Sequence, residues 1–301
     1  MFTLEALLKQ AGELPSLPEA YIRVTELLED EKSTAYQIGD AVQTDPALNS
    51  RILKLINSAY FGLRNPVTSI SQAVTLLGRD NLQQVLVGSV LSQVFKDFEV
   101  GEFPLRDFWQ HCIKTAIIAR QLAMQNARII DHEAFFTAGL LHDIGWLVIA
   151  KVNPGAYRVV GDIANREKTD VIEIERDKLG ITHVDVGVAL LKNWRIPRLI
   201  VECVRSHHQD DHSEPFEIET SIVFLANRLS RVALQDEDQD LEEILPGIPQ
   251  WEQTRCTLEQ VEIACRLAEE QWRDVMQSLG MLDPDIDAGM EDAYRFDTGL
   301  A

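Results

Sequence analysis

The sequence predicts an all-α protein with many helices, and three observations support this. Apolar residues recur at helical spacing along most of the chain. Runs of alternating β-branched residues are short and rare. Helix-start signals precede the periodic segments, most clearly at Asp45-Pro46, where Asp suits the N-cap and Pro the first helical position. With 301 residues, 46% of them apolar, the chain can form one large or two modest domains.

Local signals set the expected helix boundaries. Ser33 or Thr34 is a candidate cap for one helix, and Ser69 or Ser71 for another that ends at Gly78. The predicted helices span about 19–29, 34–42, 46–57, 70–77, 80–95, 107–125, 133–141, 154–167, 173–178, 183–194, 197–208, 217–234 and 257–279.

A break in periodicity at 98–104 divides the chain. We expect an N-terminal helical lobe over 1–98, a second helical lobe over 99–234, and an acidic linker, helix and polar tail over 235–301. In the second lobe, Thr182 and Asp185 form a predicted capping box. The helix 257–279 is expected to pack back on the domain, with a dimer contact as the alternative.

Composition excludes several classes of protein. The net charge of −20 repels nucleic-acid phosphates, and no basic patch offsets it. No window of 18 consecutive apolar residues predicts a membrane span, and the N-terminus lacks a secretory pattern. The four cysteines form no CxxC pair, so we expect reduced thiols in a cytoplasmic protein. The acidic runs at 236–240 and 283–297 fit a solvated linker and tail, or docking segments for a basic partner.

One motif, Leu140-Leu141-His142-Asp143-Ile144-Gly145, places two polar side chains between apolar runs at 135–141 and 146–150. Burying an imidazole and a carboxylate there costs free energy unless each has a partner. A metal ion, a charged ligand or a hydrogen bond within the core would each supply one.

Other histidines fall at predicted helix positions or helix ends in the same half of the chain. Asp107 and His111 are four residues apart and share one helical face. Imidazole and carboxylate groups are suitable ligands for iron, manganese and zinc. The sequence therefore predicts a divalent metal site whose candidate ligands are Asp107, His111, His142, Asp143, His183, His207 and His208.

Most of these residues also have an ordinary structural interpretation. His111 fits a hydrogen-bonded core histidine, and Asp107 fits an N-cap or a surface acid. His183 fits the first turn of a helix, and the pair His207-His208 fits a solvated helix end. The pair His142-Asp143 is the hardest to explain without a ligand.

The histidines and the His142-Asp143 motif resemble the HD superfamily of metal-dependent phosphohydrolases. Further motifs narrow the resemblance to the HDOD domain, over roughly residues 14–232. These motifs are Leu14-Pro15-Ser16-Leu17-Pro18, Asp45-Pro46-Ala47-Leu48, the segments 57–62 and 69–78, and Trp194-Arg195-Ile196-Pro197. The resemblance implies a fold of two helical lobes and a role in bacterial signalling through a protein partner, without established catalysis. HDOD domains often accompany response-regulator or diguanylate-cyclase modules, and this chain is expected to stand alone.

The sequence departs from the catalytic HD pattern at three places. Asn227 stands where HD enzymes carry a late aspartate ligand, and an uncharged amide is a weaker ligand. Trp146 stands where the cyclic-di-GMP phosphodiesterase branch has a lysine. Residues 209–212 replace the Gly-Tyr-Pro motif of that branch. The remaining ligand set is similar, with Asp107 in place of a glutamate.

Three functions fit these features. The first is a non-catalytic regulatory module that acts through protein–protein contacts and keeps a residual metal site, with no catalytic residue assigned. The second is a metal-dependent phosphohydrolase or phosphodiesterase acting on a nucleotide or cyclic dinucleotide. The third is a sensor that binds a nucleotide without cleaving it.

Overall fold

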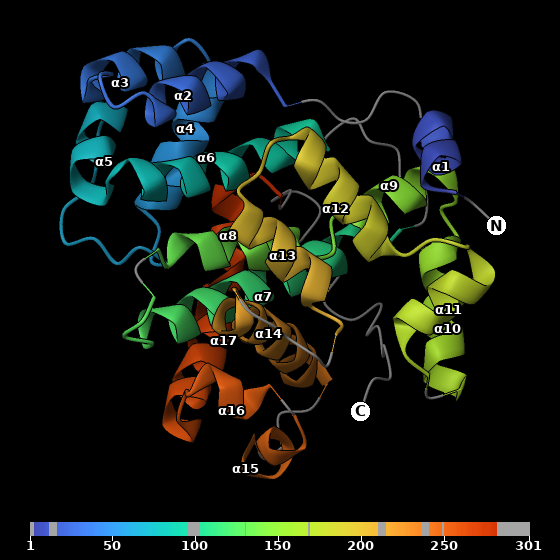
Figure 1. Cartoon of the computed structure of the whole chain (residues 1–301). Helices are drawn as coiled ribbons and strands as arrows, with labels where there is room; N and C mark the ends of the chain where they lie inside the picture. The colour runs from blue at the N-terminus through green and yellow to red at the C-terminus, as the bar shows by residue number, and fades with distance from the viewer. Residues whose placement is uncertain are drawn as a thin grey trace, which may run out of the picture.

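The structure is a computed structural model that describes residues 3–11, 17–95, 103–129, 131–167, 169–209, 215–235, 241–248 and 250–281. Every regular element in these ranges is a helix, which confirms the predicted all-α class (Figure 1). The helices are α1 Leu4–Ala11, α2 Glu19–Glu29, α3 Ala35–Gln43, α4 Pro46–Ile56, α5 Ile70–Leu77, α6 Arg79–Val94, α7 Leu105–Met124, α8 Glu133–Leu141, α9 Gly145–Val152, α10 Ala156–Glu167, α11 Val171–Lys178, α12 His183–Asn193, α13 Arg198–Ser206, α14 Glu217–Gln235, α15 Leu241–Ile244, α16 Trp251–Thr254 and α17 Leu258–Ser278, with a short 3-10 helix at Leu245–Gly247.

The N-terminal lobe comprises α2–α6, and local side chains fix its helix starts. Asp45 accepts a hydrogen bond from the Leu48 amide at 2.9 Å, as predicted for an N-cap. Of the two candidate caps of α3, Thr34 forms a capping box with Gln37, and Ser69 caps α5. These contacts lie close in sequence, so the boundaries of this lobe follow from short motifs.

The second lobe is organised around α7, which lies between α8, α14 and α17 (Figure 1). Helix α8 approaches α7 closely because Gly139 has no side chain. A Cβ atom there would lie 2.6 Å from the Cα atom of Ala116. This close packing brings the end of α8 beside the first half of α7, where His111 is located.

Helix packing joins the two lobes. Helix α6 packs against α8, and α17 packs along α7 and also reaches α4. Asp274 of α17 accepts a hydrogen bond from the Ala59 amide at 2.9 Å, so the C-terminal helix holds a turn of the N-terminal lobe. Helix α17 therefore packs back on the domain, as predicted.

Some helices were not predicted. Helix α1 packs against α9 at the far side of the second lobe, although the prediction grouped residues 1–98 in one lobe (Figure 1). Helix α9 is apolar nearly all round, so its sequence lacks the periodicity that marks a half-buried helix. Helices α15 and α16 have four residues each and lie in the predicted linker. Most of the predicted break at 98–104 and the polar tail lie outside the described residues.

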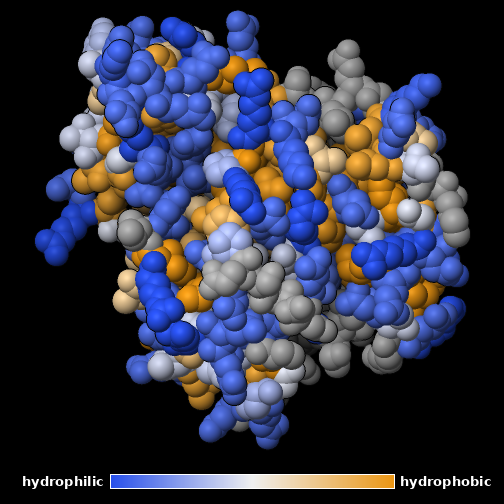
Figure 2. Space-filling view, viewed as in Figure 1, coloured by the Kyte–Doolittle hydropathy of each residue, from blue (hydrophilic) through white to orange (hydrophobic). Residues whose placement is uncertain are grey.

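The face of the molecule in Figure 2 is mainly hydrophilic among the coloured residues, with scattered apolar areas. Among the described residues, one stretch, Glu133–Val152, is long and apolar enough by composition to span a membrane. Its apolar window is 89% buried inside the protein, as expected for the core helices α8 and α9.

Candidate metal centre

The ends of three helices meet at the centre of the second lobe. His142 ends α8 and Asp143 lies in the turn before α9. His183 is the first residue of α12, and His207 lies at the end of α13. The turn passes close to α12 because Gly145 lacks a side chain, since a Cβ atom there would collide with the carbonyl oxygen of His183.

Asp143 is buried and its two oxygens face different pairs of imidazoles. Its Oδ1 atom lies 3.1 Å from Nε2 of His183 and 3.2 Å from Nε2 of His207. Its Oδ2 atom lies 3.2 Å from Nε2 of His142 and 3.5 Å from Nε2 of His111. We call these the Oδ1 side and the Oδ2 side of the centre.

The other ring nitrogen of each histidine is anchored by the protein. Carbonyl oxygens only accept hydrogen bonds, so Nδ1 of His142 and of His207 carries the proton, and the neutral ring presents a lone pair at Nε2. The Nδ1 partners are Ser230 Oγ for His111 at 3.0 Å, the Gly139 carbonyl for His142 at 2.7 Å, Glu175 Oε1 for His183 at 2.6 Å, and the Val204 carbonyl for His207 at 2.6 Å.

The Nε2 atoms therefore converge at the centre. The Nε2 atoms of His111 and His142 are 3.1 Å apart, and those of His183 and His207 are 3.2 Å apart. Such pairs repel unless a proton or a cation lies between them. His208 adds an Nε2 atom that is buried and has no hydrogen-bond partner among the described residues. These residues fit a divalent metal ion with nitrogen and oxygen ligands.

The ligand atoms form two groups, and within each group all atoms lie within 4.8 Å of one another. The group on the Oδ1 side is Asp143, His183, His207 and His208. The group on the Oδ2 side is His111, His142 and Asp143. Asp143 belongs to both groups, so its carboxylate is shared between the two ligand sets.

Burial and neighbouring charges set the pKa values of the groups at the centre. Burial lowers the pKa of His207 to about 4. Burial also opposes charge on His183, but Glu175 and Asp143 outweigh it and raise the pKa of His183 to about 10. Burial would raise the pKa of Asp143, yet His142 and His183 hold it well below its ordinary value. Without a metal, His183 therefore carries the proton that balances Asp143, and a cation at its Nε2 atom would displace that proton.

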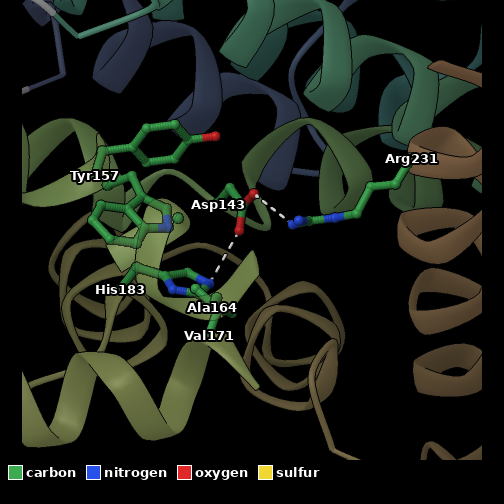
Figure 3. Close-up of a pocket in the computed structure, with 8 residues that line it drawn as sticks. Asp143, Tyr157, Ala164, Val171, His183 and Arg231 are labelled. Carbon is green, nitrogen blue, oxygen red and sulfur yellow. Dashed lines mark ion pairs between the residues drawn. The ribbon is translucent and has the colours of Figure 1, made fainter. Parts of the chain in front are cut away.

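The predicted late ligand position has a different role in this chain. Asn227 donates from Nδ2 to the His207 carbonyl at 3.3 Å and accepts at Oδ1 from Nε of Arg231 at 3.2 Å. The guanidinium of Arg231 lies 3.7 Å from Asp143 Oδ2 (Figure 3). Both ends of the Asn227 amide are engaged with the protein, so the amide orients neighbouring groups.

A small cavity adjoins the centre. Its walls include Asp143, His183, Arg231, Trp146 and Tyr157, with small side chains of α10 and α11 (Figure 3). The Trp146 ring stacks on His183 at 5.5 Å between centroids and meets the edge of Tyr157 at 4.9 Å. The cavity has a volume of about 20 Å³, enough for roughly one water molecule.

Six of the seven predicted ligands meet at this centre. Asp107 is in neither ligand group. It lies one turn before His111 on α7, is half-buried, and burial raises its pKa. Glu175, Ser230 and Arg231 also contact the centre and were not predicted from the sequence. Of these, Arg231 could have been predicted from the sequence, because it lies one helical turn after Asn227 on the same face.

The chain matches the HDOD domain family over residues 14–210. An uncharacterised protein of Treponema pallidum is 26% identical over 223 residues, which cover 73% of this chain. The chain spans only 42% of the length of that relative.

Solved structures have the same fold. A proposed phosphohydrolase of Shewanella amazonensis is 25% identical, with a TM-score of 0.74 over 91% of this chain and 97% of that one. An HDOD domain protein of unknown function from Geobacter sulfurreducens is 23% identical, with a TM-score of 0.69 over 94% of this chain and all of the other. A second Shewanella amazonensis protein, described as a proposed metal-dependent phosphohydrolase, is 21% identical, with a TM-score of 0.62 over 92% and 97% of the two chains.

Proposed function

Because the chain belongs to the HDOD domain family, we propose that it is a regulatory signalling module whose metal centre stabilises the fold and does not catalyse hydrolysis. In this proposal it acts in the cytoplasm through a protein partner, and it binds neither nucleic acid nor a membrane. The second lobe supplies a rigid, metal-held core, and the regulatory contacts are made by the helical surfaces around it.

The closed state of the centre is the observation that carries this proposal. Asp143, His142, His183 and His207 are almost fully buried. Trp146, which is 3% exposed, covers His183 where a catalytic relative would have a lysine. A hydrolase needs room for a phosphate group beside the metal, and the adjoining cavity of about 20 Å³ lacks it.

The proposed ligands of the metal are Asp143 with His183, His207 and His208, and Asp143 with His111 and His142. A divalent ion such as iron, manganese or zinc supplies positive charge and, where a coordination position is open, Lewis acidity. The protein anchors the Nδ1 atoms through Ser230, Gly139, Glu175 and Val204, so that the Nε2 atoms are fixed before the ion binds.

The second candidate function is a metal-dependent phosphohydrolase or phosphodiesterase acting on a nucleotide or cyclic dinucleotide. It is favoured by the retained ligands and by the 25% identical Shewanella protein described as a proposed phosphohydrolase. For this function, α10 and α11 would have to move, because residues of both helices line the cavity beside Asp143.

Elemental analysis and a hydrolysis assay on one preparation separate the two candidates. We expect iron, manganese or zinc bound in the purified full chain, its loss in His207→Ala, and no cleavage of a generic aryl phosphodiester. Cleavage by the wild type that disappears in His207→Ala would establish the hydrolase instead. Under the regulatory proposal, Trp146→Lys with Asn227→Asp should be needed before any cleavage appears.

A further inference from the structure

The two sides of Asp143 carry different charge. On the Oδ1 side, the groups within 3.2 Å of the carboxylate are the imidazoles of His183 and His207. On the Oδ2 side, the guanidinium of Arg231 lies 3.7 Å away, in addition to His111 and His142. Figure 3 shows Arg231 reaching Asp143 from α14, on the opposite side from His183.

Burial and a hydrogen bond hold the side chain of Arg231 in this position. Its side chain is only 16% exposed, and its Nε atom donates to Oδ1 of Asn227, one turn earlier on α14. The amide of Asn227 is fixed in turn by the His207 carbonyl. An aspartate at 227 would favour a cation at the centre, whereas the asparagine orients the guanidinium and adds no charge.

We infer that Arg231 takes the place of a second metal ion on the Oδ2 side, so that this chain binds one divalent ion, on the Oδ1 side. The inference rests on the proposed metal centre and specifies its stoichiometry. A guanidinium has a fixed positive charge and cannot be deprotonated in a protein. It therefore satisfies Oδ2 of Asp143 permanently and repels any divalent ion placed between His111 and His142.

Charge balance leads to the same result. The carboxylates in contact with the imidazoles are Asp143 and Glu175, which together balance one divalent ion. A second divalent ion would add two positive charges beside the guanidinium of Arg231, which is strongly unfavourable in a buried site. Replacing Arg231 by a neutral residue and Asn227 by aspartate removes one positive charge and adds one negative charge, which favours a second ion.

Metal titration of the full chain tests this inference. We would titrate the metal-free protein with Mn²⁺ by calorimetry, count ions after desalting, and record electron paramagnetic resonance spectra. The wild type should bind one Mn²⁺ and give the spectrum of an isolated ion. The double variant Asn227→Asp with Arg231→Met should bind two and give the spectrum of a coupled pair. The double variant should bind its second ion about 100-fold more tightly than the wild type binds a second ion.

Two further variants locate the effect. Arg228→Met is the matched control, because that guanidinium lies over the Phe224 ring at 5.3 Å and the change should leave one ion bound. Adding His111→Ala to the double variant should remove the second ion and keep the first.

The outcomes separate this inference from the proposal beneath it. If the wild type binds a coupled pair of Mn²⁺ ions, Arg231 does not replace a second ion, even if the double variant fails to fold. One ion in both the wild type and a folded double variant overturns it too. No bound ion in any variant contradicts the metal centre itself.

Discussion

The two lobes are stabilised in different ways. In the N-terminal lobe, helix caps such as Asp45 and Thr34 act locally, and Arg79 donates to the carbonyls of Leu27, Leu28 and Asp30. The second lobe buries a polar centre in which residues from α7, α8, α12, α13 and α14 meet around Asp143. Such a centre is stable only when every charge has a partner.

Under the proposed function, the second lobe is therefore the one whose stability depends on a bound metal ion. Removing one local contact from the N-terminal lobe should cost stability and leave metal binding unchanged. Removing one partner from the second lobe leaves other buried polar groups unsatisfied and should affect both.

The largest effect is expected for Asp143→Ala. The change removes the carboxylate that Arg231 and the protonated His183 share, and the loss of one partner from a buried ion pair typically costs about 3–5 kcal/mol. Urea unfolding and elemental analysis should show that loss together with loss of the metal. Retention of the metal would mean that Asp143 is not a ligand.

Metal removal should affect the lobes unequally. An ion bound at 100 times its dissociation constant stabilises the folded state by about 2.7 kcal/mol. Hydrogen exchange on chelated protein should show faster amide exchange in α8, α12 and α13, and unchanged exchange in α2–α5. Equal acceleration in both lobes would contradict the distinction between them.

Gly145→Ala should disturb the centre through the backbone. The new Cβ atom would collide with the His183 carbonyl, and overpacking of this kind typically costs about 1–3 kcal/mol. Metal affinity should fall as His183 moves. Gly187→Ala is the control, because its Cβ atom would meet neighbours at 3.5–3.7 Å, which is ordinary contact. Equal metal affinity in both variants would show that the close approach at Gly145 does not position His183.

The smallest effect is expected at the helix caps, where each lobe has a capping box that begins with a threonine. Thr182→Ala and Thr34→Ala should each cost about 1 kcal/mol in thermal unfolding, because each removes one helix cap. Thr182→Ala should also weaken metal binding, since Thr182 precedes His183, whereas Thr34→Ala should not. A parallel loss of metal affinity in Thr34→Ala would show that the lobes are energetically coupled.

The sequence predicted most of the fold because its signals are local. The caps at Asp45 and Thr182 and the stop at Gly78 each depend on residues within one helical turn. Helix α1 was not predicted, because its position depends on packing against α9, far along the chain.

The candidate site was predictable only in its imidazoles and Asp143. Glu175 binds the ring and amide of His183, yet it lies in a helix with acidic neighbours, and its sequence gives no sign that it is fully buried. The spacing of Asp107 and His111 did predict a shared face of α7, but a shared face does not fix the depth at which each side chain lies.

Anomalous X-ray scattering from crystals of the metal-loaded full chain would locate and count the ions at the centre. We expect one peak, bonded to Asp143 Oδ1 and to Nε2 of His183 and His207 at about 2.1 Å, with Arg231 still beside Oδ2 and Trp146 still covering His183. No peak at this centre would contradict the metal site. A peak with an open, solvent-filled coordination position large enough for a phosphate would contradict its non-catalytic role.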